Sequence, residues 1–369
     1  MPETPASSPR LLLSPRLLLS KRLLPSKRIW PSSPPAQPTG DNTALAVRQR
    51  VTPHQAPRLA RRTLLGLGGA MAAALLAAAA PTLLPALQPP GAGALAQGQR
   101  LLRLGAIPDQ KPEKLNRLYP LVAAELSRQL GVQVKYVPVV DYAAAVTAFR
   151  TGDLDLVWFG GLTGVQARLQ KPGARVLAQR DIDAGFHSIF IASTKSGLQP
   201  FFPQSGLKVL KGKRFTFGSE SSTSGRLMPQ LFLRQAGVTL NDFAGPPGFS
   251  GSHDATIALV ASGAYDAGVV NEQVWRTSQR EGKALRSKVI ALWRSPAYPD
   301  YHWIAQGTLD SRFGQGFTTR LQKAILSWRP SDPEQKTILS LFGAQQFTTA
   351  QASDYAAIEA VGRQIGKIR

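Results

Sequence analysis

The sequence predicts an α/β protein of two domains that follow a long segment without a fold of its own. Strand and helix patterns alternate from Leu101 onward, which is typical of α/β sheets. The chain beyond Ala96 is longer than one compact core usually holds, so we expect two domains. Residues 1–60 show no sustained helix or strand periodicity, and the whole of residues 1–96 is expected to lie outside both domains.

Residues 1–60 are rich in Pro, Ser, Arg and Leu, and we expect them to be disordered and basic. The pair Arg61-Arg62 then precedes an apolar run over 64–80, and an Ala-Leu-Ala sequence ends at Ala96. This order is typical of a twin-arginine export signal that is cleaved after the small residues. A membrane anchor left in place is the alternative, but the many Ala and Gly make the run weakly apolar for a span.

Composition excludes several classes of site. The chain has 0 cysteines, so disulfides, thiolate zinc sites, cysteine nucleophiles and lipid-modified cysteines are excluded. The formal charge is +22, and the chain stays clearly basic without residues 1–96. Because chromosomal DNA is not available to an exported protein, we expect no nucleic-acid partner. The charge favours small anions or an anionic membrane face, with a solvated basic surface as the alternative.

The first elements alternate in order. A strand over 101–108 precedes a helix whose leucines and valine recur every three or four residues up to Gly131. A strand over 132–140, a helix opened by Asp141 and an apolar strand over 154–160 follow. This order indicates a parallel sheet with helices on both faces.

The alternation continues with five more strands and three more helices. We expect strands over 174–180, 186–194, 214–219, 264–270 and 288–295, and helices over 226–237, 253–263 and 271–282. The first of these helices contains Pro229, which predicts a kink. Beyond Asp310 the pattern is helical, and these helices are expected to pack on the first domain.

The domains are expected to be residues 97–194 with 296–369, and residues 195–295. The chain would cross between them near Thr194 and near Ser295, forming a two-strand hinge with a ligand cleft. Ligands of such sheets bind beyond the carboxyl ends of the strands.

Three strand ends collect Gly or hydroxyl residues, and each precedes a helix. They are residues 158–163, 221–224 and 251–253. A helix start offers unpaired N–H groups and a partial positive charge, so it suits an anion. Helix capping alone explains each stretch singly. Three such stretches in one basic, exported chain favour a tetrahedral anion held between them.

Four stretches carry a family resemblance: "VVDYAAAVTAFRTGDLDLVWFGGLTG", "SESSTSG", "GFSGSHDATIALVASGAYDAGVVNEQVW" and "LWRSPAYPDYHW". Together they resemble the solute-binding proteins of phosphonate and phosphite ABC importers, and "GAIPDQ" and "QRDIDAGFHSIFIAS" resemble the branch labelled selenate-binding. The resemblance implies the type II periplasmic-binding-protein fold and a periplasmic monomer. It also implies an inner-membrane permease partner, no metal and no cofactor.

The resemblance also implies a set of ligand-binding residues. Tyr142 would reach the anion through its hydroxyl, and Glu272 and Asp300 stand where some members hold an amine. Where the family often has a second tyrosine, this chain has His187, which could donate to a further anion oxygen. The full expected set is Tyr142, Phe159, Gly160, His187, Ser222, Thr223, Ser224, His253, Glu272 and Asp300.

Structural roles remain open for several members of this set. Phe159 suits a core position, His187 an ordinary strand end, and His253 an ordinary helix cap. Glu272 and Asp300 suit surface acids.

Enzyme motifs are incomplete. The stretch "GLKVLKGKR" lacks the spacing of a phosphate-binding loop, and "GFSGS" lacks the last glycine of a nucleophile elbow. The 4 histidines show no metal-ligand spacing. We therefore expect a binding protein and not an enzyme. The alternative is a periplasmic module that binds the same anion and docks on a signalling receptor.

Overall fold

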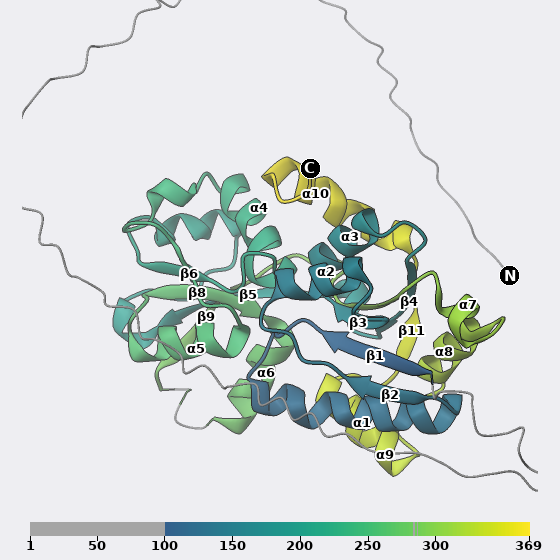
Figure 1. Ribbon diagram of the computed structural model, residues 1–369. Coiled ribbons are helices and arrows are strands. Elements are labelled where there is room, and N and C mark those ends of the chain that lie inside the picture. Colours follow the sequence, from purple (N-terminus) through teal and green to yellow (C-terminus); the bar gives the residue numbers. More distant parts are fainter. Residues whose placement is uncertain (1–99, 283–284, 286) are drawn as a thin grey trace, which may run out of the picture. The chain divides into compact units, whose positions relative to one another are not determined.

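The computed structural model describes residues 100–282, 285 and 287–369 (Figure 1). The predictions of an unfolded basic segment and an export signal concern residues outside this part. Residues 100–369 belong to one compact unit of the chain.

Within the described residues there are two sheets, one of six strands and one of five. The first sheet has the order β11-β4-β10-β3-β1-β2 and contains β1 (Leu101–Ala106), β2 (Gln133–Tyr136), β3 (Leu156–Phe159), β4 (Arg175–Arg180), β10 (His302–Ala305) and β11 (Phe347–Thr349). The second has the order β7-β6-β8-β5-β9 and contains β5 (Ser188–Ser193), β6 (Phe215–Phe217), β7 (Gly248–Phe249), β8 (Ala267–Asn271) and β9 (Val289–Arg294). We call each sheet with its helices a lobe.

The first sheet is completed by a strand that follows the second lobe in sequence. β1 pairs in parallel with β2 and β3, as predicted, but β10 lies antiparallel between β3 and β4. The chain therefore leaves the first lobe after β4 and returns to its centre as β10. The sheets are mixed, not purely parallel as the sequence pattern indicates.

The first crossing lies earlier than predicted. β5 belongs to the second sheet, where it pairs with β8 from Ser188 opposite Asn271. The crossing therefore lies between Arg180 and Ser188, not near Thr194. The second crossing, between Arg294 and His302, falls where the sequence places it.

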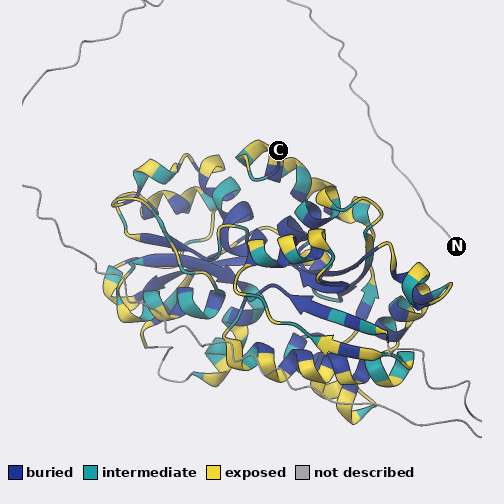
Figure 2. Cartoon of the chain, in the orientation of Figure 1, coloured by how far each residue is buried: buried dark blue, intermediate teal, exposed yellow. Residues whose placement is uncertain are grey.

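Helices cover both sheets and turn their buried faces toward the strands (Figure 2). The first lobe has α1 (Pro112–Leu130), α2 (Tyr142–Thr151), α3 (Gly161–Gln170), α7 (Leu309–Phe313), α8 (Phe317–Leu326), α9 (Pro333–Phe342) and α10 (Ala356–Ile365). The second lobe has α4 (Met228–Gln235), α5 (His253–Ser262) and α6 (Glu272–Glu281). α8 and α9 pack on α1, as expected for the C-terminal helices, whereas α10 also contacts α4.

Local differences from the sequence pattern occur at short elements. Residues Thr223–Leu227 form a π-helical turn before α4, and Pro229 lies in the first turn of α4, where proline is tolerated. β7, β10 and β11 have two to four residues each and lie in stretches that the sequence pattern leaves as loop or helix.

A buried arginine contacts both of the segments in which the chain passes from one lobe to the other. Arg180 donates to Asp183 from Nε at 2.7 Å and from Nη2 at 2.6 Å. Its guanidinium lies 4.8 Å from the ring centroid of Tyr301 and 5.4 Å from that of Phe186. Since Phe186 and Tyr301 lie on different crossings, this cation–π stack ties the crossings together.

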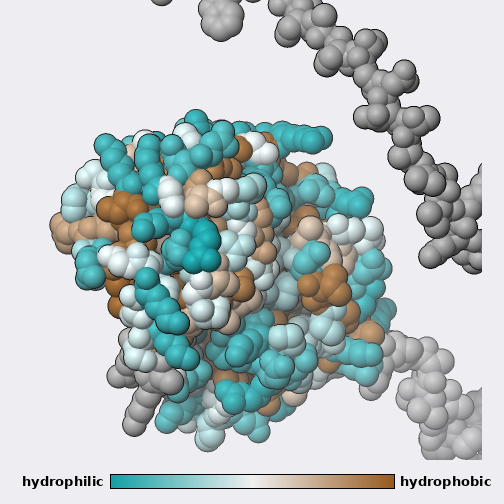
Figure 3. All heavy atoms as spheres, turned by 90° about the vertical axis from the view of Figure 1, so that its left-hand side faces the viewer, coloured by the Kyte–Doolittle hydropathy of each residue, from teal (hydrophilic) through white to brown (hydrophobic). Residues whose placement is uncertain are grey.

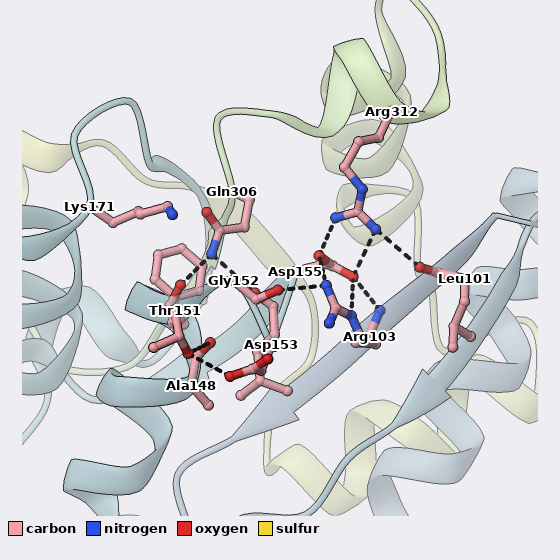
Figure 4. A network of polar contacts seen from close by, with 12 residues as sticks. Leu101, Arg103, Ala148, Thr151, Gly152, Asp153, Asp155, Lys171, Gln306 and Arg312 are labelled. Carbon is pink, nitrogen blue, oxygen red and sulfur yellow. Dashed lines mark hydrogen bonds and ion pairs between the residues drawn. The ribbon is translucent and has the colours of Figure 1, made fainter.

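A second buried ion-pair network lies in the first lobe (Figure 4). The Asp155 carboxylate, fully buried, accepts from the backbone N–H of Arg103 at 2.8 Å and from its guanidinium at 3.0 Å, and also pairs with Arg312. Although burial acts to raise it, these arginines hold the pKa of Asp155 below its usual value. The network joins β1, β3 and α7.

The surface is mainly hydrophilic on the face of the second lobe that Figure 3 presents, with apolar side chains in separate patches. In the described ranges, no helix combines the length and apolarity required to cross a membrane.

Asp155→Ala is expected to lower the free energy of unfolding by roughly 2 kcal/mol, because it removes the buried acceptor of several charge-assisted hydrogen bonds, whereas the two arginines, 31% and 38% exposed, can still reach water. Since the pKa of Asp155 is depressed, its contribution is present at neutral pH and is lost as the pH falls below about 4. Urea unfolding at pH 7 and at pH 3 measures both effects. An equal loss at the two pH values would contradict the assignment.

Candidate functional site

The three hydroxyl residues before α4 have three different roles. Ser222 caps the turn, because its Oγ accepts from the N–H of Gly225 at 2.9 Å. Thr223 Oγ1 accepts from the N–H of Leu162 in the opposite lobe at 2.9 Å. Ser224 Oγ is buried and has no hydrogen-bond partner. Helix capping thus accounts for the Ser222 hydroxyl but not for those of Thr223 and Ser224, which lie at the junction of the lobes.

Tyr142 is the first residue of α2, which Asp141 caps. Its hydroxyl is buried and has no hydrogen-bond partner, although the Ser222 hydroxyl lies close enough to act on its pKa. Burial, followed by the charges of Asp109 and Asp300, raises the pKa of Tyr142 well above its usual value. Tyr142 therefore keeps its proton and is available as a donor.

One carboxyl oxygen of Asp300 accepts a hydrogen bond, and the other has no hydrogen-bond partner. Oδ1 accepts from the N–H of Gly161 at 2.9 Å, whereas Oδ2 is buried without a partner. Burial raises the pKa of Asp300 to about 7, against the opposing effects of Gly161 N–H and of the Thr223 and Ser224 hydroxyls. Near neutral pH this side chain can therefore either accept or donate a proton.

His253 is the first residue of α5 and is buried. Burial lowers its pKa to about 4, so the imidazole is neutral. Its Nδ1 accepts from the backbone N–H of Asn271 at 3.2 Å, which places the proton on Nε2. Nε2 lies 3.4 Å from the Tyr301 hydroxyl. His253 is thus oriented as a neutral donor.

Two glycines allow these groups to approach one another. A Cβ on Gly160 would lie 3.3 Å from both Asp300 Oδ1 and Thr223 Oγ1. A Cβ on Gly225 would lie 2.9 Å from Ser222 Oγ and 3.2 Å from His253 Cε1. We call the residues brought together here the cleft cluster: Tyr142, Gly160, Ser222, Thr223, Ser224, His253 and Asp300.

Phe159 and His187 make their ring and hydrogen-bond contacts with residues outside the cleft cluster. Phe159 is fully buried and packs edge-on against Phe149, with ring centroids 5.7 Å apart. His187 is half-buried, and its Nδ1 lies 2.7 Å from the carbonyl oxygen of Ser295 on the second crossing. The structure therefore gives Phe159 a core position and His187 a place at the hinge.

Glu272 is paired with arginines. Its Oε1 lies 2.7 Å from Arg276 Nη2 and 2.8 Å from Arg294 Nε. It lines a cavity of about 660 Å³ bounded by the first crossing, α6 and the end of α9. The carboxylate that the resemblance assigns to an amine is thus already neutralised by two cations.

Two further side chains at the site, Asp109 and Tyr301, do not stand out in the sequence. The sequence does single out the start of α3, where the Gly161 N–H donates to Asp300 on the second crossing and the Leu162 N–H donates to Thr223 of the second lobe. Asp109 follows the first strand, and Tyr301 follows Asp300; the Tyr301 hydroxyl acts on the pKa of Asp109, which burial raises to about 6. A strand end before a helix is the signal that could have drawn attention to Asp109.

The cleft cluster is suited to holding an oxyanion. It presents neutral hydroxyl and imidazole donors together with one acid whose charge changes near neutral pH. In the described part of the chain, no three His, Asp or Glu side chains come together as a metal-binding group.

Known proteins match most of the chain. Residues 104–355 match the family model of the periplasmic substrate-binding protein of phosphonate ABC transporters. Over 271 residues the chain is 53% identical to the probable ABC transporter phosphite binding protein PhnD1 of Prochlorococcus marinus, covering 73% of this chain and 91% of that protein.

Solved structures also match. The structure of PhnD1 from Prochlorococcus marinus in complex with methylphosphonate has 52% identity and a TM-score of 0.72, covering 73% of this chain and 100% of that one. A binding protein component of a Pseudomonas aeruginosa ABC phosphonate transporter has 20% identity and a TM-score of 0.63, covering 71% of this chain and 85% of that one, and shares the fold.

His253 is expected to titrate near pH 4, below the ordinary histidine value, because its site excludes water. The unfolded chain then binds a proton that the folded chain does not, so stability falls as the pH drops from about 6.5 to about 4. Nitrogen-15 NMR of the imidazole, assigned with His253→Gln, measures the midpoint and the tautomer. A midpoint near 6.5, or a proton on Nδ1, would contradict the described geometry.

Proposed function

The chain belongs to the phosphonate-binding family of periplasmic substrate-binding proteins of ABC transporters, and on that premise we propose that its cleft cluster binds a phosphite-like or methylphosphonate-like anion. The type II periplasmic-binding fold expected from the sequence is confirmed by the solved relatives. The protein is a periplasmic component of an ABC importer and works with the permease of that importer. We further propose that it is exported by the twin-arginine route.

Three polar atoms support the proposal most strongly: Tyr142 Oη, Ser224 Oγ and Asp300 Oδ2. Each is buried, and none makes a hydrogen bond of good geometry, although the Ser224 hydroxyl is near enough to Asp300 to lower its pKa and the Ser222 hydroxyl near enough to Tyr142 to lower that of the phenol. A buried polar atom left without a partner costs about 1–3 kcal/mol, so three of them in one cluster are unfavourable unless a ligand satisfies them. An anion with three or more oxygens supplies the missing partners from one position.

Neutral donors suffice to hold such an anion. Hydrogen bonds to a charged group contribute about 1.5–3 kcal/mol each, before the costs of closure and desolvation. Tyr142, Ser224 and His253 Nε2–H can donate in this way.

Asp300 supports a phosphorus anion over sulfate or selenate. Phosphite and methylphosphonate exchange a proton near neutral pH, so a protonated anion oxygen can donate to the vacant Oδ2. Sulfate and selenate carry no proton at that pH, and an ionised Asp300 repels them. Selenate, which one branch of the family suggests, therefore becomes a competitor to be tested.

The pairing of Glu272 with two arginines argues against an aminoalkyl phosphonate. An amine would have to displace Arg276 and Arg294 before it could use this carboxylate. The proposed ligand therefore lacks an amine, and Glu272, Phe159 and His187 are left out of the proposed site.

Calorimetry with methylphosphonate, phosphite, phosphate, sulfate and selenate tests the proposal. Methylphosphonate and phosphite are expected to bind more tightly than sulfate and selenate at pH 7.5. Ser224→Ala, Thr223→Val and His253→Ala are each expected to weaken binding by about tenfold or more, equivalent to 1.4 kcal/mol. Ser221→Ala, in the same hydroxyl run but only half-buried, is the matched control and is expected to change affinity less than about twofold. Unchanged affinity in all three variants would refute the proposed site.

The pH dependence of sulfate binding isolates the role of Asp300, because sulfate itself does not titrate between pH 6 and 9. Sulfate is expected to require protonated Asp300, so its Kd should rise by about tenfold for each pH unit above 7. In Asp300→Asn this slope is expected to vanish and the preference for methylphosphonate over sulfate to fall. An identical slope in the variant would exclude Asp300 as the selective acid.

A further inference from the structure

Helix α1 of the first lobe has no side-chain cap of its own. Its N-cap residue is Lys111, whose side chain makes no capping hydrogen bond, and Pro112 follows. The backbone N–H of Lys111 instead donates to Asp254 Oδ2 at 3.0 Å. Asp254 is the second residue of α5, so the acceptor comes from the opposite lobe.

The same carboxylate makes a second contact with α1. Its Oδ1 lies 3.4 Å from Lys114 Nζ, and the side chains are 10% and 30% exposed. This ion pair is more shielded from water than the usual surface pair, whose net contribution is small. One residue earlier, the N–H of His253 donates to the carbonyl oxygen of Asp109 at 3.0 Å.

These contacts join the start of α5 to the segment 109–114 of the first lobe. We infer that Asp254 is a closure latch: it couples the binding of the anion at His253 to the closing of the lobes, by capping α1 only when the lobes meet. This inference rests on the proposed function. We call the contacts of Asp254 with Lys111 and Lys114 the Asp254 latch.

The coupling follows from chain geometry. His253 and Asp254 are consecutive residues in the first turn of one helix, so a shift of α5 moves both together. An anion that draws His253 toward Tyr142 of the first lobe also brings Asp254 to α1. The Asp254 latch is therefore a differential contact between open and closed states, which is what a ligand-driven change of population requires.

The latch predicts an effect on dissociation. The contacts of Asp254 form after the anion has entered the cleft. Asp254 should therefore lower the dissociation rate of the anion more than it raises the association rate. Asp254→Ala is expected to raise the Kd for methylphosphonate by about tenfold, mainly through a faster dissociation rate. Asp254→Asn keeps an acceptor oxygen for the Lys111 N–H and loses the charge, so a smaller loss is expected.

The experiment is stopped-flow binding of methylphosphonate to the wild-type protein and to Asp254→Ala, Lys114→Met and the double variant. In the double variant the losses are expected to be less than additive, because both changes break the same contact. Glu281→Gln is the matched control: Glu281 lies 3.7 Å from the same lysine but is 63% exposed, and no change is expected.

The outcomes separate the latch from the proposed function. Wild-type protein that binds none of the phosphorus anions refutes the proposed function. Wild-type binding with an unchanged dissociation rate in Asp254→Ala refutes the latch alone. Additive losses, or an equal loss in Glu281→Gln, would show a general charge effect and would also overturn the latch. Lys114→Met, at a half-buried surface position, keeps the test valid if Asp254→Ala fails to fold.

Discussion

The burial of unpaired polar atoms between two lobes is the constraint on which the rest of the structure depends. Tyr142 Oη comes from the first lobe, Ser224 Oγ from the second, and Asp300 Oδ2 from the second crossing between them. Such a cleft is unfavourable in free energy until a ligand with several oxygens binds in it. The hydrogen bond between Leu162 N–H and Thr223 Oγ1 shows how closely the lobes approach around that position. Binding of the anion and closure of the lobes are therefore coupled in this molecule. The chemistry of the unpaired atoms determines which anion binds.

The fold places these atoms through its chain path. β10 returns from the second lobe into the middle of the first sheet, next to β3, so Asp300 just before β10 meets Gly161 just after β3. The crossings are held by Arg180, stacked among the rings of Phe186 and Tyr301, which lie on different crossings. A hinge of this sort lets the lobes move as bodies, so that contacts between the lobes, including those at the start of α5, respond to the ligand.

Local pattern predicts much of this structure, and long-range pairing accounts for what it misses. The alternation of strands and helices up to β9, and the hydroxyl run before α4, follow from periodicity and capping chemistry. The antiparallel insertion of β10 depends on a partner about 145 residues earlier in the chain, which no local pattern encodes. Glu272 shows the same limit, because its nearest cation beyond its own helix, Arg294, comes from β9. A backbone amide of β8 determines the tautomer of His253, and the start of α1 determines the role of Asp254. Neither can be predicted from the residues next to them in the sequence.

The most direct measurement is a crystal structure of the protein grown with methylphosphonate. The expected result is an anion whose oxygens lie within about 3.2 Å of Tyr142 Oη, Ser224 Oγ and Asp300 Oδ2, the distance range of hydrogen bonds. An anion held instead in the cavity beside Glu272 and Arg276, with those three atoms still unpaired, would contradict the central claim.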